Sequence, residues 1–246
     1  MRSIITGSPE PPEVGPINAN QITFLTIEGN IGAGKSTLMK NLKLCFPPGD
    51  PDVVFIDEPV QEWMDEGLLQ NLYEKKISSG SFQHAALNSI VAYARSAILA
   101  APKGTKLFIA ERSVGSNLNV FAQAAISDEL ERRAFEYSAA KMVATLPVNL
   151  VYKHVILQAY PETCMERVRE RDRVSESAIT VPYLQQLHDL HNDWIAKDAT
   201  EEEAPEWFFI DAAQETPAVF ADAMMHIMGI LQTVHPWQGH WVASSQ

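Results

Sequence analysis

The sequence predicts an α/β fold, a parallel five-stranded sheet with helices on both faces. Short apolar segments alternate along the chain with longer segments of helical period. This alternation is typical of parallel sheets, because a helix usually makes the crossover between neighbouring strands. The chain has 246 residues, and no linker rich in Pro, Gly or Ser divides its middle. We therefore expect a single domain.

The expected strands are short apolar segments of buried character, as helix-covered strands should be. They lie at residues 22–28, 53–56, 106–110, 155–158 and 207–210. In open parallel sheets, ligands bind beyond the carboxyl ends of the strands. The residues that follow these segments are therefore the first candidates for a functional site.

The expected helices are the segments whose apolar residues recur every three or four positions. They lie at residues 37–44, 61–73, 82–101, 118–144, 161–171, 182–197 and 217–233. Because most of them separate two strands, the pattern contains the crossovers that a parallel sheet needs.

A phosphate-binding signature follows the first strand directly. The spacing G-x-x-x-x-G-K-S begins at Gly29 and precedes an expected helix, which is the context that this signature requires. The glycines let backbone N–H groups turn toward an anion, Lys35 can reach the terminal phosphates, and Ser36 can ligate Mg²⁺. The sequence predicts that nucleotide phosphates bind to Gly29-Asn30-Ile31-Gly32-Ala33-Gly34-Lys35-Ser36-Thr37.

Charged residues follow the second and third strands. Asp57 and Glu58 come after one strand, and Glu111 and Arg112 come after the other. A phosphoryl transferase needs a carboxylate to accept the proton of the attacking hydroxyl and cations to stabilise the transferred group. Glu58 suits the first role and Arg112 the second. The alternative is a structural ion pair between these two residues at the edge of the sheet.

The composition narrows the class of function and the compartment. The formal net charge of −12 argues against a nucleic-acid binder, because such proteins present a basic field to the phosphate backbone. Cys45 directly follows an expected helix and Cys164 falls in another, so we expect two small core residues and a reducing compartment. No apolar run is long enough to span a bilayer. We expect a soluble protein of the cytoplasm or nucleus, without a nucleic-acid or membrane partner.

The two ends of the chain are expected to lie outside the domain. Residues 1–20 lack a helical period, the apolar core of a secretory signal and the Arg-rich composition of a mitochondrial transit peptide. The lack of these patterns predicts a flexible leader at residues 1–20. The domain is expected at residues 21–233, followed by a C-terminal tail at residues 234–246.

Several segments resemble, in the same order, the motifs of the deoxyribonucleoside kinases, the family of deoxycytidine, deoxyguanosine, mitochondrial thymidine and insect multisubstrate kinases. The resemblance covers roughly residues 22–211. Its motifs are the phosphate loop, Glu58-Pro59-Val60 with Trp63, Phe82-Gln83, Glu111-Arg112-Ser113-Val114, and segments between residues 157 and 194. The resemblance implies a P-loop NTPase-like fold with a helical lid. It also implies a Mg²⁺-dependent kinase that uses ATP to phosphorylate the 5′-hydroxyl of a deoxynucleoside.

The resemblance further implies roles for individual residues. Glu58 would be the general base, with Arg112 and Lys35 as the other catalytic residues, while Ser36 and Glu111 would hold Mg²⁺. The residues implied to contact the nucleoside are Glu58, Trp63, Tyr73, Phe82, Gln83, Ile90, Arg112, Asn117, Phe121 and Glu176.

Within that set, Gln83 would hydrogen-bond the edge of the base, and Tyr73 with Glu176 would meet the sugar 3′-hydroxyl. Trp63, Phe82 and Phe121 would pack around the base, as aromatic walls often do in ligand pockets. The alternative for these three aromatic residues is a place in an ordinary core.

The lid implied by the resemblance carries phosphate-binding arginines at Arg167, Arg171 and Arg173. Arg167 and Arg171 lie one helical turn apart and can hold phosphates together. Arg169 is additional to the family pattern. The alternative is a charged helix surface whose arginines pair with neighbouring acids. His188 and His191 could suggest a metal site, but no further ligands cluster nearby in the sequence, which favours helix packing.

Two positions depart from the deoxycytidine and deoxyguanosine kinases, which carry an arginine and an aspartate facing the base. This chain has Ile90 and Asn117 there, and thymidine-accepting relatives also place an apolar residue at the first position. We therefore expect a preference for pyrimidine nucleosides.

Two other functions stay open at this point. A nucleoside monophosphate kinase would need a further basic site for the phosphate of its acceptor. A non-catalytic nucleotide-binding subunit on the same fold would tolerate the loss of Lys35, Glu58 or Arg112, and all three are present. The partners expected are ATP and a deoxynucleoside, and the resemblance implies a homodimer formed through helices 82–101 and 118–144.

Overall fold

The computed structural model describes residues 21–146, 149–173, 176, 178–202 and 204–234. The leader expected at residues 1–20 and residues 235–246 of the tail expected at residues 234–246 lie outside the described residues. None of the helices in the described part of the chain is long and apolar enough to cross a bilayer.

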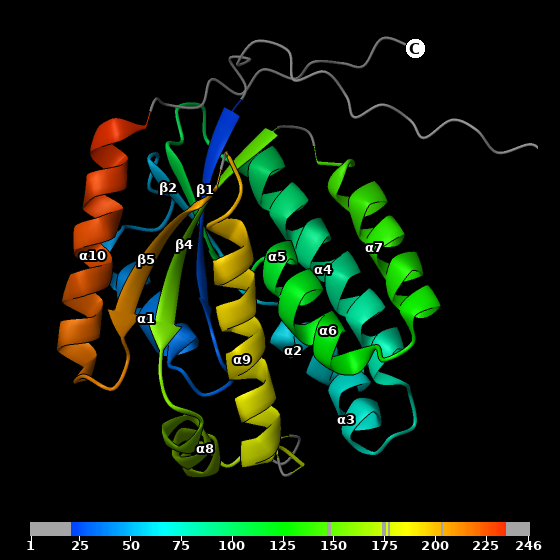
Figure 1. Ribbon diagram of the computed structural model, residues 1–246. Helices are drawn as coiled ribbons and strands as arrows, with labels where there is room; N and C mark the ends of the chain where they lie inside the picture. The colour runs from blue at the N-terminus through cyan, green and yellow to red at the C-terminus, as the bar shows by residue number, and fades with distance from the viewer. Residues whose placement is uncertain (1–20, 147–148, 174–175, 177, 203, 235–246) are drawn as a thin grey trace, which may run out of the picture.

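Five parallel strands form one sheet in the order β2-β3-β1-β4-β5 (Figure 1). The strands are β1 Gln21–Gly29, β2 Val53–Ile56, β3 Leu107–Glu111, β4 Asn149–Gln158 and β5 Glu206–Asp211. The parallel α/β fold predicted from the sequence is therefore confirmed. β4 begins earlier than predicted, at Asn149, because its first half is partly exposed and includes Lys153 and His154, which obscure the apolar pattern.

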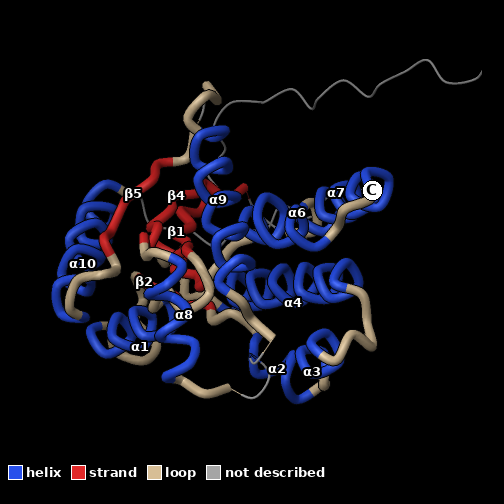
Figure 2. Tube along the Cα trace, turned by 60° about the horizontal axis from the view of Figure 1, so that its bottom comes forward, coloured by secondary structure: helices blue, strands red, loops and turns tan. Residues whose placement is uncertain are grey.

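Helices connect and cover the strands. They are α1 Lys35–Cys45, α2 Val60–Asp65, α3 Leu68–Tyr73, α4 Ser79–Ala100, α5 Val114–Ser116, the π-helix η1 Asn117–Phe121, α6 Ala122–Ala125, α7 Glu129–Val143, α8 Pro161–Glu170, α9 Val181–Asp198 and α10 Thr216–Thr233. Figure 2 shows α1 and α10 on one side of the sheet and α4, α6, α7 and α9 on the other.

Alternate side chains along the strands form two separate cores, as the two-residue period of a strand requires. Leu25 and Ile27 of β1 face α1 and α10 in a core that includes Leu38 and Ile227. Phe24 faces the other way and packs with Phe108 and with Ile98 of α4. The sheet is thus fixed between two helical layers.

The single helix predicted at residues 61–73 is wrong, because the structure divides it into α2 and α3. Gly67 stands between them with a φ of 68°, in the left-handed region where glycine has no Cβ penalty. The N–H of Gly67 donates to Met64 O, which ends the first helix. The turn directs α2 and α3 toward the same cavity.

The single helix predicted at residues 118–144 is also wrong. η1 and α6 end at Ile126, which is extended (φ −114°, ψ 99°), and α7 then begins behind the N-cap Asp128. Ile126 is 3% exposed, so packing of its side chain fixes the break. Periodicity could not show this break, because apolar residues recur on both sides of it.

The two cysteines have different environments. Cys164 is fully buried in the core, as predicted, but the prediction of a buried Cys45 is wrong. Cys45 is the last residue of α1, beside Leu44, whose exposed fraction is 79%. The end of α1 therefore extends past the sheet that would cover it.

The strand register brings the carboxyl ends of β2, β3, β1 and β4 together. Ile27 of β1 lies opposite Glu111 of β3, and Ile56 of β2 lies opposite Ala110. Gly29 lies opposite Leu157 of β4. The residues that follow these strands therefore meet at one edge of the sheet.

Candidate active site

The glycine-rich loop joins β1 to α1 in a conformation that other residues could not adopt. Gly29 and Gly32 have φ values of 134° and 83°. A Cβ on Gly29 would lie 2.7 Å from Leu157 O, and a Cβ on Gly32 would lie 2.4 Å from Cys164 O. Both glycines are thus required by backbone angle and by the closeness of neighbouring backbone.

The loop is also held from outside. The Asn30 side chain donates from Nδ2 to Leu184 O over 2.8 Å, which ties the loop to the first turn of α9. Its Oδ1 accepts from the N–H of Ile31 at 2.8 Å. The polar side chain of Asn30 therefore serves to fix the loop.

Lys35 is the first residue of α1 and is 5% exposed. Its ammonium donates to Gly29 O at 3.1 Å and to Asn30 O at 2.8 Å. Burial, with the nearby charge of Arg112 as a second cause, lowers the pKa of Lys35 to about 8. A poorly solvated ammonium at the base of a phosphate loop favours the binding of an anion.

Arg112 and Glu58 form an ion pair between the loop and a neighbouring cavity. Arg112 Nε lies 3.0 Å from Glu58 Oε1, and the exposed fractions of the two side chains are 6% and 15%. Arg112 also donates from NH1 to Gly29 O at 3.1 Å, and its guanidinium lies 4.4 Å from the centroid of the Phe121 ring. Its φ of 66° is uncommon for a residue other than glycine. This strained backbone turns the guanidinium toward the loop.

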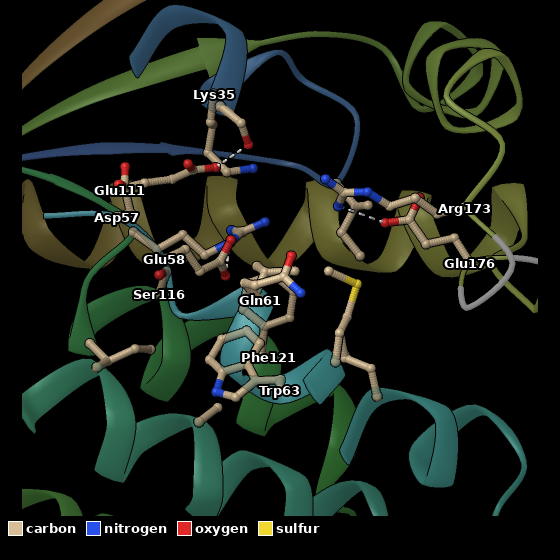
Figure 3. A pocket seen from close by; sticks show the side chains of 18 of the residues that line it. Lys35, Asp57, Glu58, Gln61, Trp63, Glu111, Ser116, Phe121, Arg173 and Glu176 are labelled. Atoms are coloured by element: carbon tan, nitrogen blue, oxygen red, sulfur yellow. Dashed lines mark hydrogen bonds and ion pairs between the residues drawn. The ribbon is translucent and has the colours of Figure 1, made fainter. Parts of the chain in front are cut away.

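Glu111 and Ser36 place two oxygens beside the loop. Ser36 Oγ donates to Glu111 Oε1 at 2.7 Å. Burial raises the pKa of Glu111, and the negative charge of Glu58 raises it further. Figure 3 shows Glu111 and Lys35 on one side of Glu58, and Trp63 and Phe121 on the other. The carboxylates, the ammonium and the aromatic rings therefore surround one centre.

A cavity of about 610 Å³ extends from this centre between α2, α3, α4 and η1. Trp63 and Phe82 form one wall, with their ring centroids 5.4 Å apart in an edge-to-face arrangement. Trp63 Nε1 donates to Ser89 Oγ at 2.8 Å, which fixes the indole. We refer to this space as the acceptor cavity. Its lining includes every residue that the sequence analysis implied for the nucleoside: Glu58, Trp63, Tyr73, Phe82, Gln83, Ile90, Arg112, Asn117, Phe121 and Glu176.

Gln83 and Asn117 meet in the acceptor cavity. Asn117 Nδ2 donates to Gln83 Oε1 at 2.8 Å, and the two residues are 3% and 6% exposed, respectively. Asn117 begins the π-helix η1, and Phe121 ends it. Such local widening of a helix is frequent at functional sites, and here both of its end residues line the cavity.

Tyr73 and Glu176 lie near each other at another part of the cavity. Burial raises the pKa of Tyr73 to about 12, with the charge of Glu176 as the next cause. Glu176 accepts from Arg171 at 2.6 and 2.7 Å and from Arg173 at 3.4 Å. The acid that pairs with these arginines is therefore Glu176, which the sequence analysis had considered only for the sugar.

A second cavity of about 250 Å³ lies on the other side of the loop. Residues 32–37 line it together with Arg167, Arg171, Ala212 and Gln214. Arg167 of α8 donates to Ala33 O at 3.3 Å and to Ala212 O at 2.7 Å, so it connects α8, the loop and the segment after β5. We refer to this space as the donor cavity. The two cavities share Gly32, Lys35, Ser36 and Arg171.

The structure adds residues that the sequence analysis gave no role. Gln61, Ser116 and Tyr183 also line the acceptor cavity. Ser116 directly precedes Asn117, and Tyr183 belongs to the segment that resembles the family, so proximity to these motifs was the available indication. His191 is 4% exposed, hydrogen-bonds through Nδ1 to Leu187 O at 2.6 Å and stands edge-on to Phe121. Burial lowers its pKa to about 3, which suits a neutral packing residue.

The chain is similar to known proteins over most of its length. A family model described as deoxynucleoside kinase matches residues 25–229. Deoxycytidine kinase of Homo sapiens is 33% identical over 204 residues, which cover 71% of this chain and 76% of that protein. Mitochondrial deoxyguanosine kinase of Xenopus laevis is 28% identical over 207 residues, with 74% and 76% covered. Thymidine kinase of Ictalurid herpesvirus 1 is 32% identical over 182 residues, with 69% and 73% covered.

Proposed function

The chain belongs to the deoxynucleoside kinase family, and from this premise we propose that it transfers the γ-phosphoryl group of ATP to the 5′-hydroxyl of pyrimidine deoxynucleosides. The observation that carries the proposal is the Glu58–Arg112 ion pair of 3.0 Å. This pair lies where the acceptor cavity meets the phosphate loop, so both substrates can reach it. The product is the deoxynucleoside 5′-monophosphate.

In the proposed reaction, Glu58 accepts the proton of the 5′-hydroxyl. The oxygen forms a bond to the γ-phosphorus while the bond to the β,γ-bridging oxygen breaks, and ADP leaves. Arg112 and Lys35 donate to the phosphoryl oxygens as their charge is redistributed. Arg167 and Arg171 line the donor cavity, and Arg173 lines the acceptor cavity; all three are proposed to contact phosphate.

Ser36 and Glu111 fit a magnesium ion. Both offer oxygen, which Mg²⁺ prefers, and they lie beside the loop with Oγ and Oε1 2.7 Å apart. A buried carboxylate with a raised pKa gains from a nearby cation, and Glu111 is such a group. A magnesium ion held by Ser36 and Glu111 would supply positive charge that offsets the negative charge of the β- and γ-phosphates.

The nucleoside is proposed to lie between Trp63, Phe82 and Phe121, with its base edge against Gln83. Ile90 adds an apolar surface without a charge, and Asn117 adds a neutral amide, so these two positions supply no charged pair that would demand one base. Tyr73 and Glu176 are proposed to bind the 3′-hydroxyl, since both line the same cavity. These features support a preference for thymidine and deoxycytidine.

Two further properties are proposed on the same premise. The protein forms a homodimer through α4 and α7, and it acts in the cytoplasm or nucleus. Leu99 of α4 and Leu130 and Tyr137 of α7 support a dimer, since their exposed fractions are 43%, 73% and 66%.

The experiment that tests this function measures initial rates with ATP and Mg²⁺ for the four natural deoxynucleosides and for thymidine monophosphate. We expect kcat/KM to be higher for thymidine and deoxycytidine than for either purine nucleoside. A purine preference of about tenfold, corresponding to 1.4 kcal/mol, would contradict the proposed base preference. Turnover of thymidine monophosphate alone would favour a nucleoside monophosphate kinase, for which Lys40 and Lys43 line the cavity as candidate phosphate ligands.

A further inference from the structure

Gln83 and Asn117 form an amide pair in the wall of the acceptor cavity. The single hydrogen bond between them runs from Asn117 Nδ2 to Gln83 Oε1 over 2.8 Å. Both side chains line the cavity and are almost completely buried, so bulk water does not compete for their amide groups. The orientation of one amide therefore constrains the orientation of the other.

The pair leaves one buried acceptor unused. Asn117 Oδ1 is inaccessible to solvent and has no hydrogen-bond partner within the described part of the chain. Buried polar atoms of native proteins are nearly always paired, so a free acceptor beside a ligand cavity needs an explanation. Gln83 carries an amide nitrogen that could satisfy it, but in this orientation Gln83 presents its oxygen to Asn117.

Rotation of both amides by half a turn would exchange the two ends of this hydrogen bond. Gln83 Nε2 would then donate to Asn117 Oδ1, and the pair would again contain one hydrogen bond. An amide has a donor and an acceptor of nearly the same size and shape, so the exchange requires little additional space. The pair consequently has two arrangements with equivalent internal bonding.

Thymine and cytosine also differ by an exchange of donor and acceptor, along the base edge that an amide can bind. Thymine presents a donor at N3 and an acceptor at O4, whereas cytosine presents an acceptor at N3 and a donor at N4. A glutamine that binds both must exchange its oxygen and nitrogen between the two bases. Gln83 alone could do this only by losing or reversing its bond to Asn117.

We propose that Gln83 and Asn117 reverse together, and that this coupled rotation lets one cavity accept thymidine and deoxycytidine with similar efficiency. The proposal rests on the proposed function. Asn117 acts as a specificity-determining residue through Gln83, because its amide can donate to one orientation of Gln83 and accept from the other. Ile90 allows this balance, since its side chain has no donor or acceptor that would favour one base.

The test replaces Asn117 by residues of similar size that allow one orientation or neither. In Asn117→Asp, an ionised carboxylate only accepts, so Gln83 must direct Nε2 toward position 117 and is held in one orientation. In Asn117→Leu, neither orientation gains a hydrogen bond from position 117. The measurement is kcat/KM for thymidine and for deoxycytidine at pH 8, together with calorimetric Kd values for both nucleosides.

We expect Asn117→Asp to change the thymidine-to-deoxycytidine ratio by about tenfold or more, because a site with a fixed donor rejects the base that cannot accept from it. Asn117→Leu should weaken both nucleosides and leave the ratio within about threefold of the parent, a difference below 1 kcal/mol. Melting temperatures of the three proteins check that each variant is folded, and if Asn117→Asp does not fold, Asn117→Ser, which can donate and accept, must keep the parent ratio.

The outcomes separate this inference from the proposed function. An unchanged ratio in Asn117→Asp, with both nucleosides still phosphorylated, would overturn the coupled rotation and leave the kinase function intact. A parent protein that phosphorylates neither pyrimidine would overturn the proposed function instead. A ratio that changes as much in Asn117→Leu as in Asn117→Asp would also overturn the coupling. Altered packing at position 117 would then be sufficient to explain the change in the ratio.

Discussion

At the scale of single residues, the proposed chemistry depends on Glu58. Replacement by glutamine preserves its shape and a hydrogen bond to Arg112 but removes the group that accepts the proton. We expect Glu58→Gln to lower kcat by about a hundredfold or more, the usual size of a general-base contribution. Kd values for ATP and the nucleoside, measured by calorimetry, should change little. Glu66→Gln, an exposed carboxylate at the end of α2, is the matched control. A Glu58→Gln enzyme that turns over within a few-fold of the parent would remove Glu58 from the mechanism.

Lys35 gives the enzyme an expected pH dependence. Its pKa is lowered to about 8, chiefly by burial, so in the free enzyme the positive charge is lost as the pH rises through that value. We expect kcat/KM for ATP to fall above pH 8, since this parameter reports the ionisation of free enzyme. Lys35→Arg should be less active but should lose this alkaline decline, because a guanidinium stays charged. A parent profile that is flat from pH 7 to 9.5 would show that the charge of Lys35 does not limit ATP capture.

At the scale of elements, the phosphate loop is shaped by glycines that differ in their surroundings. Gly32 and Gly104 both have positive φ values, 83° and 94°, so alanine at either position meets backbone strain. Only at Gly32 would the new Cβ also meet a backbone atom, Cys164 O at 2.4 Å, whereas nothing lies within 4 Å at Gly104. Overpacking of this kind costs about 1–3 kcal/mol in addition to the shared strain.

We therefore expect Gly32→Ala to lower the melting temperature more than Gly104→Ala and to weaken ATP binding by about tenfold or more, since 1.4 kcal/mol corresponds to a factor of ten. Differential scanning calorimetry and ATP titration measure the two effects. Equal losses in both variants would mean that φ strain, and not the contact between the loop and α8, determines the shape of the loop.

The arginines of α8 and of its C-cap differ in what they contact. Arg167 binds the backbone of the loop and of the segment after β5, and Arg171 binds Glu176, while Arg169 is exposed. We expect Arg167→Ala and Arg171→Ala each to lower kcat/KM for ATP strongly, because charge-assisted contacts to phosphate strengthen as charge develops during transfer. Arg169→Ala should change kcat/KM for ATP little. Steady-state kinetics of the three variants decide the matter, and the largest loss in Arg169→Ala would contradict the assignment.

At the scale of the whole molecule, α7 exposes apolar side chains that a dimer would cover. Leu130 and Tyr137 are 73% and 66% exposed, and we expect Leu130→Glu with Tyr137→Glu to convert a dimer into a monomer, because an interface core excludes unpaired charge. Light scattering of the purified parent and of the double variant measures the mass. Tyr160→Glu is the control, since Tyr160 is 72% exposed and lies before α8. A monomeric parent at micromolar concentration would contradict the proposed dimer.

Much of the fold could be predicted from local patterns. The alternation of apolar segments and helical periods predicted a parallel sheet, because the periods of strands and helices can be recognised from the spacing of apolar residues. The phosphate loop could be predicted as directly, since its glycines, Lys35 and Ser36 lie in one short segment and act through local backbone geometry. The same local rules could not place the breaks at Gly67 and Ile126, because an isolated glycine is tolerated in helices and a buried isoleucine looks helical until its packing is known.

The sequence by itself determined the fold class, the phosphate loop and the set of residues implied for the site, which remain predictions until the variants are measured. Only the tertiary structure decided how those residues meet. Arg112 and Glu58 are far apart in sequence but come within 3.0 Å because β2 and β3 are neighbours in register. Gln83 meets Asn117 because α4 packs against η1. No sequence pattern shows which of the two amides donates the hydrogen bond between them. Local periodicity depends on neighbouring residues, whereas these contacts depend on the packing of elements distant in the chain.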